Sequence, residues 1–294
     1  MIELDPQRLF RRLAREIPGS LQRHLMIVGS LAAAYHYRSR LKRRAVNTKD
    51  ADVIVHPAGD VGACMQIADT LLGLGWTRTD KCYPKARAKP HEDLRAIRLH
   101  PPESPDYFIE LLGLPKRTQR ERVAWVPVRL IDGWYGVGCH RFMAVTSKGR
   151  LRSKEGLDYA SPAAMALTNA LSHSDLGEKR MSEPVGGRAI LRSAKDLGRV
   201  LALAWLEGRE GTEAWLPEWR RMLKECFPSR WRTLARSAGK GLRSLLDSPT
   251  ALEEARITTE VGLLNRLDVS TDMLHATGER LFADVISALA DPNA

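Results

Sequence analysis

The chain has 294 residues, of which 44% are hydrophobic and 28% charged, and it carries a formal net charge of +11 at pH 7. These proportions are ordinary for a folded globular protein and argue against a disordered chain, and the length suits one large domain or two modest ones. No apolar run approaches the roughly 20 residues of a membrane-spanning helix. We therefore expect a cytoplasmic protein without membrane contact.

The excess of Lys and Arg over Asp and Glu favours a polyanionic partner, because a basic surface raises the local concentration of polyanions and speeds their capture. Nucleic acid is the natural partner of this kind. Charge alone is equally compatible with a basic protein that binds nothing in particular.

The cysteines are scattered along the chain, at Cys64, Cys82, Cys139 and Cys226. None of them forms the Cys-x-x-Cys spacing that is typical of zinc sites. We expect reduced thiols, with neither a zinc site nor a disulfide framework.

The first element predicted is a helix over residues 1–18, ended by Pro18-Gly19. The stretch 26–55 follows and carries most of the chemistry. Its pattern predicts a short apolar strand over 26–28, a Gly29-Ser30 turn, a helix, a basic segment and a second strand. That second strand contains two aspartates.

Asp50 and Asp52 are two positions apart on this strand, so their side chains project from the same face. Two like charges side by side in a sheet are costly unless a cation lies between them. Mg²⁺ suits the pair, because it is usually held by one or two carboxylates together with waters and substrate phosphates. Gly29 would let a phosphate approach the backbone, and the helix starting at Ser30 would offer it unpaired N–H groups.

The segment between the helix and the aspartate strand is strongly basic, and its cations are Arg38, Arg40, Lys42, Arg43 and Arg44. They could hold a nucleoside triphosphate or an RNA backbone. For any one of them an exposed hinge is an equally good interpretation. Lys49 could contact a phosphate or merely balance the charge of the aspartates.

A helix over 61–73 and a polar loop over 81–93 come next, followed by strands over 94–99 and 106–112. Glu110 is the only charge in the middle of the second of these strands. A buried carboxylate there costs several kcal/mol unless it is paired or bound to a metal. Its structural alternative is an ion pair with Arg95 or Arg98.

Residues 123–145 predict strands around an Asp132-Gly133 turn, and the segment 146–162 is interpreted as a linker. After Pro162 every periodic segment is helical: 162–173, 189–207, 217–226, 229–246, 249–265 and 271–290. The sequence thus predicts an α+β protein. A mixed-sheet domain over 1–150 is followed by a helical bundle over 151–294.

The order Val28-Gly29-Ser30, helix, then Asp50-Ala51-Asp52 resembles the nucleotidyltransferases of the polymerase-beta superfamily. Within this superfamily, the segment NTKDADVIV and the later segment RSAKDLGRVLALAWL are most similar to the AbiEii/MenT-like toxins. The resemblance covers about residues 20–210 and is most specific over 26–55. It implies a nucleotidyltransferase fold in the N-terminal domain.

The resemblance also implies a site. Asp50 and Asp52 would hold Mg²⁺. Glu110 would be the third acid, on a neighbouring strand, that contacts the metal and helps deprotonate the acceptor hydroxyl, with Asp106 as its substitute. The nucleotide would contact Gly29, Ser30, Arg43, Lys49, Lys195 and Asp196. For Lys195 and Asp196, an exposed pair of charges on a helix is an equally good interpretation.

One departure stands out. Where the similar families place a lysine on the helix before Lys195, this chain has Thr168, Asn169 and His173. Lys179 or Arg180 could replace it, and substrate choice and rate need not carry over.

The expected activity is transfer of a nucleoside monophosphate from an NTP to a hydroxyl, with RNA, in particular the 3′ end of tRNA, as acceptor. The expected role is that of a toxin countered by an antitoxin protein. A non-catalytic nucleic-acid-binding protein of the same fold remains an alternative. So does a nucleotidyltransferase acting on a small molecule or a protein.

Overall fold

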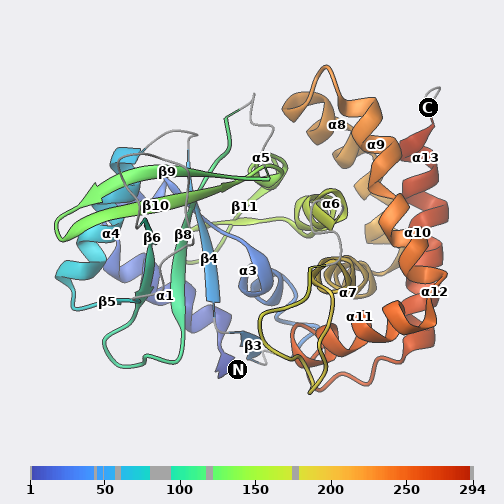
Figure 1. Cartoon of the computed structure of the whole chain (residues 1–294), viewed down its shortest axis with the longest axis horizontal. Helices are drawn as coiled ribbons and strands as arrows, with labels where there is room; N and C mark the ends of the chain where they lie inside the picture. Colours follow the sequence, from blue (N-terminus) through green and yellow to red (C-terminus); the bar gives the residue numbers. More distant parts are fainter. Residues whose placement is uncertain are drawn as a thin grey trace. The chain divides into compact units, whose positions relative to one another are not determined.

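The computed structural model describes residues 2–42, 45–48, 50–56, 61–79, 94–116, 122–173 and 179–291. Its contacts divide the chain into two compact units. Unit 1 comprises Met1–Tyr35 and Arg44–Ala160, and unit 2 comprises His36–Arg43 and Ser161–Ala294. The first is built on a mixed sheet and the second is helical, so the mixed class that the sequence predicts is confirmed (Figure 1).

The sheet of unit 1 has a main path of seven strands, in the order β11 (Arg150–Arg152), β12 (Asp158–Ala160), β2 (Leu25–Ile27), β4 (Asp50–Val55), β8 (Phe108–Gly113), β10 (Gly133–His140) and β6 (Arg95–Ala96). Within the described residues, three further strands lie off this path: β5 (Thr77–Arg78), β7 (Arg98–His100) and β9 (Val123–Leu130). Strand β4 runs antiparallel to β2 and parallel to β8. A separate antiparallel pair joins β1 (Ile2–Leu4) to β3 (Val46–Thr48).

The helices of unit 1 are α1 (Pro6–Glu16), α2 (Gly19–Gln22), α3 (Gly29–His36), which continues one residue into unit 2, α4 (Val61–Gly73) and α5 (Met143–Thr146). The helix predicted over 1–18 starts later than expected. Asp5 caps α1 by accepting from the backbone N–H groups of Gln7 and Arg8, and Pro6 takes the first helical position. The residues before this cap form β1 instead.

An aromatic cluster holds α1 and α3 together. The rings of Phe10 and Tyr35 stack with centroids 4.1 Å apart, and Tyr159 of β12 meets Tyr35 edge-on at 5.2 Å. Tyr35 is buried, yet its hydroxyl donates to Glu155 and accepts from the backbone N–H of Lys154. This satisfied hydroxyl fixes the helix that begins at Gly29.

The segment 146–162 is not a linker, contrary to the prediction. It contains the antiparallel strands β11 and β12, and β12 continues the sheet by pairing in parallel with β2. Each strand is only three residues long and β11 exposes two arginines, so neither presents the apolar run that identifies a strand in sequence. The division between the units follows Ala160, later than the predicted boundary at 150.

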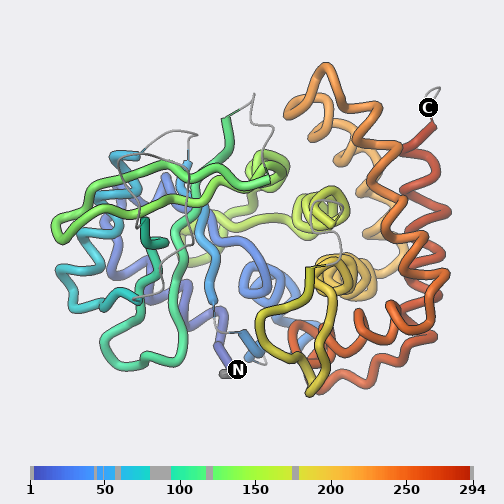
Figure 2. The backbone as a smooth tube through the Cα atoms, viewed as in Figure 1, coloured from blue at the N-terminus to red at the C-terminus, as the bar shows by residue number. Residues whose placement is uncertain are grey.

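Unit 2 contains α6 (Pro162–Ser172), α7 (Arg192–Glu213), α8 (Trp215–Cys226), α9 (Trp231–Ala238), α10 (Lys240–Leu246), α11 (Pro249–Val261), α12 (Thr271–Leu281), the π-helix η2 (Phe282–Ile286) and α13 (Ser287–Ala290). Figure 2 traces α6 and α7 next to each other, and both are rich in buried residues. Trp219 is fully buried and its indole N–H donates to the carbonyl of Ala163 at 2.9 Å. The helical character predicted for this half is confirmed.

Two predicted helices of unit 2 are interrupted. The one expected over 229–246 divides at Gly239 into α9 and α10, and the one expected over 271–290 contains η2. Cys64, Cys139 and Cys226 are buried, while Cys82 lies outside the described residues. None of the helices in the described ranges combines the length and apolar character that a bilayer crossing demands.

Candidate functional site

Asp50 and Asp52 lie on β4 with their side chains on one face of the sheet. Ala51 and Val53, which alternate with them, are buried, whereas both aspartates are half-buried. The hydroxyl of Thr48 donates to the Asp50 carboxylate at 2.8 Å, which orients that group. The predicted alternation along this strand is confirmed.

Glu110 is the direct neighbour of Asp52 across the sheet. Strands β4 and β8 are parallel, with Asp52 opposite Glu110 and Asp50 opposite Phe108. Opposite residues of paired strands project from the same face, so the three carboxylates share one face of the sheet. Glu110 is only 7% exposed, so its charge requires a partner.

That partner is Arg98 of β7. This strand is antiparallel to β8 and places Arg98 opposite Glu110, and the guanidinium Nε lies 2.8 Å from a carboxylate oxygen. The Arg98 guanidinium carbon also lies 5.0 Å from the centre of the Phe108 ring. Asp52, Glu110 and Arg98 thus form a charged row across three adjacent strands. Of the two ion-pair partners that the sequence allows, the structure selects Arg98.

Gly29 lies against this row. Its φ is +74°, a left-handed conformation that favours glycine, and a Cβ added there would stand 2.9 Å from a carboxylate oxygen of Asp52. The backbone N–H of Val28 donates to the carbonyl of Asp52 at 2.9 Å, which fixes the approach. Helix α3 begins at Gly29, so the start of a helix and the acidic row meet at one place.

This proximity sets a chemical condition. A helix N-terminus attracts anions, and Asp52 already brings a negative charge to it. A phosphate entering the same place would be repelled by Asp52 unless a cation stood between them. The arrangement therefore suits a phosphate that arrives together with a metal ion.

The donors present fit Mg²⁺. Within the described part of the chain, no group of three or more His, Cys, Asp or Glu side chains is placed to bind one ion. Mg²⁺ does not require such a cage, because one or two carboxylates with waters and substrate phosphates suffice. Asp50 and Asp52 supply two half-buried carboxylates on one face. Glu110 is paired with Arg98 in this structure.

The other predicted nucleotide contacts stay predictions. Arg43 and Lys49 lie outside the described residues. Ser30 is half-buried in the first turn of α3, beside Gly29. Lys195 and Asp196 are half-buried on α7, in unit 2.

The start of the basic segment belongs to unit 2 and contacts the end of α7. Arg40 donates to the carbonyl of Leu206, and the Tyr37 hydroxyl donates to Glu207. Burial, followed by this hydrogen bond, raises the pKa of Tyr37 above its usual range. Arg40 thus anchors its own segment to α7, and both Arg40 and Lys42 are exposed. The nucleotide contact expected of this segment stays a prediction.

The sequence analysis missed one contributor to this site, the hydrogen bond from Thr48 that orients Asp50. A Ser or Thr two residues from an Asp is a signal for such a bond, although a weak one. Comparison with family models, with curated proteins and with solved structures found no match to this chain.

Proposed function

We propose that this protein is a Mg²⁺-dependent nucleotidyltransferase that transfers a nucleoside monophosphate from an NTP to an acceptor hydroxyl. The observation that carries the proposal is the meeting of Asp50, Asp52 and Glu110 on one sheet face with the Gly29 start of α3. Carboxylates for a metal and a helix N-terminus for phosphates are the two parts that this chemistry needs.

In the proposed reaction the acceptor oxygen forms a bond to the α-phosphorus as the bond from that phosphorus to the bridging oxygen breaks. Pyrophosphate leaves with the bonding electrons, and the hydroxyl proton passes to the Glu110 carboxylate. When bound, Mg²⁺ supplies the positive charge that stabilises the attacking and leaving oxygens.

Each residue has a distinct part in this proposal. Asp50 and Asp52 hold the metal, and the hydroxyl of Thr48 keeps Asp50 in position. Glu110 completes the acidic face and accepts the proton, while Arg98 is a positioning residue that fixes the Glu110 carboxylate. Gly29 leaves the space next to Asp52 that a side chain would fill.

For the acceptor we propose RNA, and in particular the 3′ end of tRNA. Two considerations support this choice: the net charge of +11 and the resemblance of residues 26–55 to the AbiEii/MenT-like toxins. The corresponding biological role is a growth-inhibiting toxin neutralised by an antitoxin protein.

The direct test is to incubate the purified protein with Mg²⁺, each labelled NTP and total RNA. Label in RNA that depends on Mg²⁺ supports the proposal. Label found only in protein or in small molecules would show that the acceptor is not RNA. No label with any acceptor contradicts the enzymatic assignment.

A second function is favoured by one observation. The ion pair between Arg98 and Glu110 satisfies the buried carboxylate without any metal, as expected for a sheet that serves only as a scaffold. A non-catalytic nucleic-acid-binding protein would retain RNA affinity and show no labelling. Asp50→Asn/Asp52→Asn separates the two functions, because it removes the metal ligands and leaves the surface of unit 2 unchanged.

A further inference from the structure

Helices α9 and α10 carry a stripe of cations along one side. Arg232, Arg236 and Lys240 are exposed and follow one another at intervals of four residues, and Arg243 follows one turn later. A single residue, Gly239, separates the two helices. At 1.5 Å per residue, Arg232 and Arg236 of α9 are offset by about 6 Å along the helix axis.

Three of these cations have no acidic partner among the residues that the structure describes. Other arginines of unit 2 are paired, for example Arg209 with Glu213 at 3.0 Å and Arg221 with Glu225 at 3.1 Å. Considering only the described residues, no carboxylate lies within ion-pair distance of Arg232, Arg236 or Lys240. The whole segment 215–246 has eight Lys and Arg residues against two Glu residues. Like charges this close repel each other, so binding of a polyanion would stabilise the stripe.

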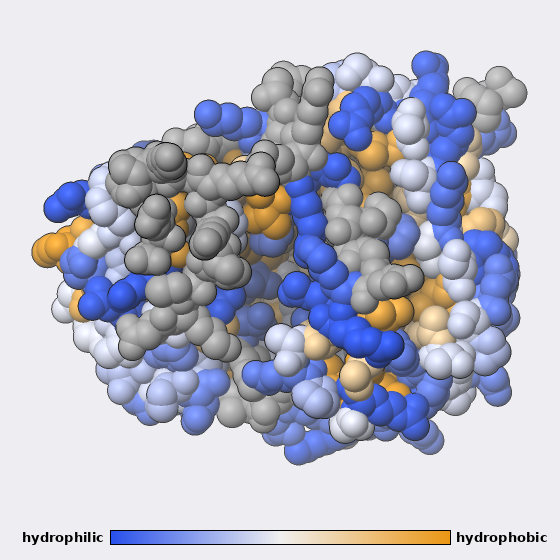
Figure 3. Space-filling model, in the orientation of Figure 1, coloured by the Kyte–Doolittle hydropathy of each residue, from blue (hydrophilic) through white to orange (hydrophobic). Residues whose placement is uncertain are grey.

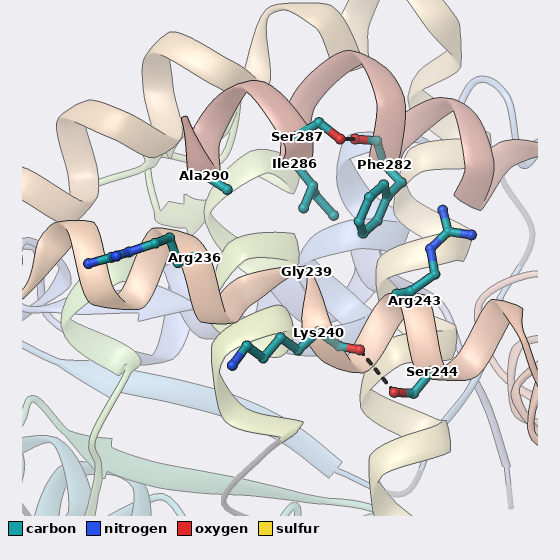
Figure 4. Close-up of a pocket in the computed structure, with 9 residues that line it drawn as sticks. All are labelled: Arg236, Gly239, Lys240, Arg243, Ser244, Phe282, Ile286, Ser287 and Ala290. Atoms are coloured by element: carbon teal, nitrogen blue, oxygen red, sulfur yellow. Dashed lines mark hydrogen bonds between the residues drawn. The ribbon is translucent and has the colours of Figure 1, made fainter. Parts of the chain in front are cut away.

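A cavity of about 450 Å³ opens beside the stripe, as Figure 4 shows. One wall consists of the stripe residues Arg236, Lys240 and Arg243, and the other is formed by Phe282, Ile286 and Ala290. A Cβ added at Gly239 would collide with Ile286, so glycine permits the close approach of the two walls. The Arg243 guanidinium lies 4.3 Å from the centre of the Phe282 ring, and Glu279 holds that guanidinium with two contacts of 2.9 Å.

The aromatic wall is built on an unusual turn. Phe282 begins the π-helix η2, and the hydroxyl of Ser287 donates to its carbonyl at 2.9 Å. Short π-helical turns inside α-helices occur frequently at functional sites. The cavity thus combines cations, an aromatic ring and aliphatic side chains within one part of unit 2. On the face drawn in Figure 3, the helices of this unit otherwise present mainly hydrophilic residues, with apolar ones in smaller patches.

We propose that this surface binds single-stranded nucleic acid, with phosphates along Arg232, Arg236 and Lys240 and one base in the cavity against Phe282. A single strand is the ligand that offers both regularly spaced negative charges and flat apolar groups. A duplex keeps its bases stacked inside, and an acidic peptide or an anionic membrane presents charge without bases. This assignment concerns binding alone and does not depend on the transfer reaction.

The stripe is tested by fluorescence anisotropy with a labelled unstructured RNA, without NTP or Mg²⁺. Arg232→Gln/Arg236→Gln/Lys240→Gln should weaken binding at least about tenfold near 0.1 M salt. It should also reduce the slope of log K against log[salt] by about 2, since each phosphate contact on a single strand contributes about 0.7. The matched control is Arg8→Gln/Arg11→Gln/Arg15→Gln, which removes the same charge from exposed positions of α1 in unit 1. Equal losses in the two variants, or none in the first, would overturn the proposal.

The cavity is tested with a base-free strand of the same length. The wild-type protein should bind the base-containing RNA about tenfold or more tightly, and Phe282→Leu should remove that preference. RNA carrying 4-thiouridine should cross-link on irradiation to peptides spanning 232–243 or 282–290 in the wild-type chain, a readout that does not depend on how the variant folds. Equal affinity for base-free strands, duplex or anionic vesicles, or cross-links confined to other peptides, would contradict the assignment.

Discussion

The charged row of unit 1 and the basic stripe of unit 2 are built in opposite ways. In the row, the buried charge of Glu110 lies between Asp52 and Arg98, and strand register places all three. In the stripe, Arg232, Arg236 and Lys240 are exposed at helical spacing. A charge removed from water requires a partner within the fold, whereas an exposed one is stabilised by water and needs none.

The difference teaches what each kind of charge is suited to do. A partnered, half-buried carboxylate has a fixed position, which suits metal binding and catalysis. Unpaired exposed cations act over about a Debye length, roughly 10 Å at 0.1 M salt, which suits the capture of a polyanion. The following predictions test this contrast, beginning with the largest expected effect.

Asp50→Asn/Asp52→Asn should reduce nucleotide transfer on the order of 10³-fold or more, because it removes the metal-binding charges with little change in volume. Transfer is measured as label incorporated into RNA, and circular dichroism checks the fold. The matched control is Asp268→Asn/Asp272→Asn, since both aspartates are exposed and belong to unit 2. Undiminished labelling by the double variant would show that the chemistry occurs elsewhere.

Arg98→Met should lower the free energy of unfolding by about 2–3 kcal/mol, because it leaves Glu110 buried without its cation. Adding Glu110→Gln should recover part of this loss. Urea denaturation of the four members of this double-mutant cycle measures the coupling. As a control, Arg209→Met breaks an exposed pair and should cost less than about 0.5 kcal/mol. If Arg98→Met and Arg209→Met lowered the free energy of unfolding by similar amounts, the distinction between buried and exposed charges would be contradicted.

Gly29→Ala should destabilise unit 1 by about 1–2 kcal/mol through its left-handed backbone, and it should also displace the Asp52 carboxylate and reduce transfer. Gly73→Ala is the matched change, because Gly73 ends α4 with open space around its Cβ and no positive φ. That variant should be neutral or slightly stabilising. Thermal melting of both proteins provides the comparison, and equal melting temperatures would contradict it.

Glu253 on α11 is an intermediate case, a paired charge at the surface. Hydrogen bonds from Arg256 and then from Thr271 hold the pKa of Glu253 at about 2, against an ordinary value of 4.5. Between these two pH values the unfolded carboxylate takes up a proton before the folded one, so stability is lost as pH falls from 4.5 to 2. Glu253→Gln should reduce this acid-induced loss in the free energy of unfolding by only about 0.5 kcal/mol, because water and salt screen the ion pair. The effect is measured from the urea midpoints of the wild-type protein and the variant at pH 5 and pH 2.5. If the variant showed the same pH dependence of stability as the wild-type protein, the prediction would be wrong.

Local patterns predicted much of the fold. The alternation along β4, the Asp132-Gly133 hairpin turn and the helix starts at Pro162 and Pro249 depend on neighbouring residues, and all appear in the structure. Very short strands were missed because three residues carry too little pattern, as β1 and β11 illustrate. The break at Gly239 and the π-helical turn arise from packing between helices, which leaves no period in the sequence.

The site was predicted less completely than the fold. Local alternation could place Asp50 and Asp52 on one face, but it could not show that Glu110 would lie opposite Asp52 or that Arg98, not Arg95, would be its partner. Those relations depend on the register of strands that are distant in sequence. The cavity beside Phe282 was not anticipated, because its two walls come from α9–α10 and from η2–α13, which are distant in sequence.

The parallel pairing of β4 with β8 has a consequence for the timing of synthesis. The two strands are distant in sequence, so β8 is synthesised well after β4. Non-local contacts of this kind form slowly, and they must form before Asp52 and Glu110 become neighbours. A ribosome-bound chain that ends before β8 has the two aspartates without the third acid. The protein therefore acquires its complete acidic face only when β8 has paired with β4.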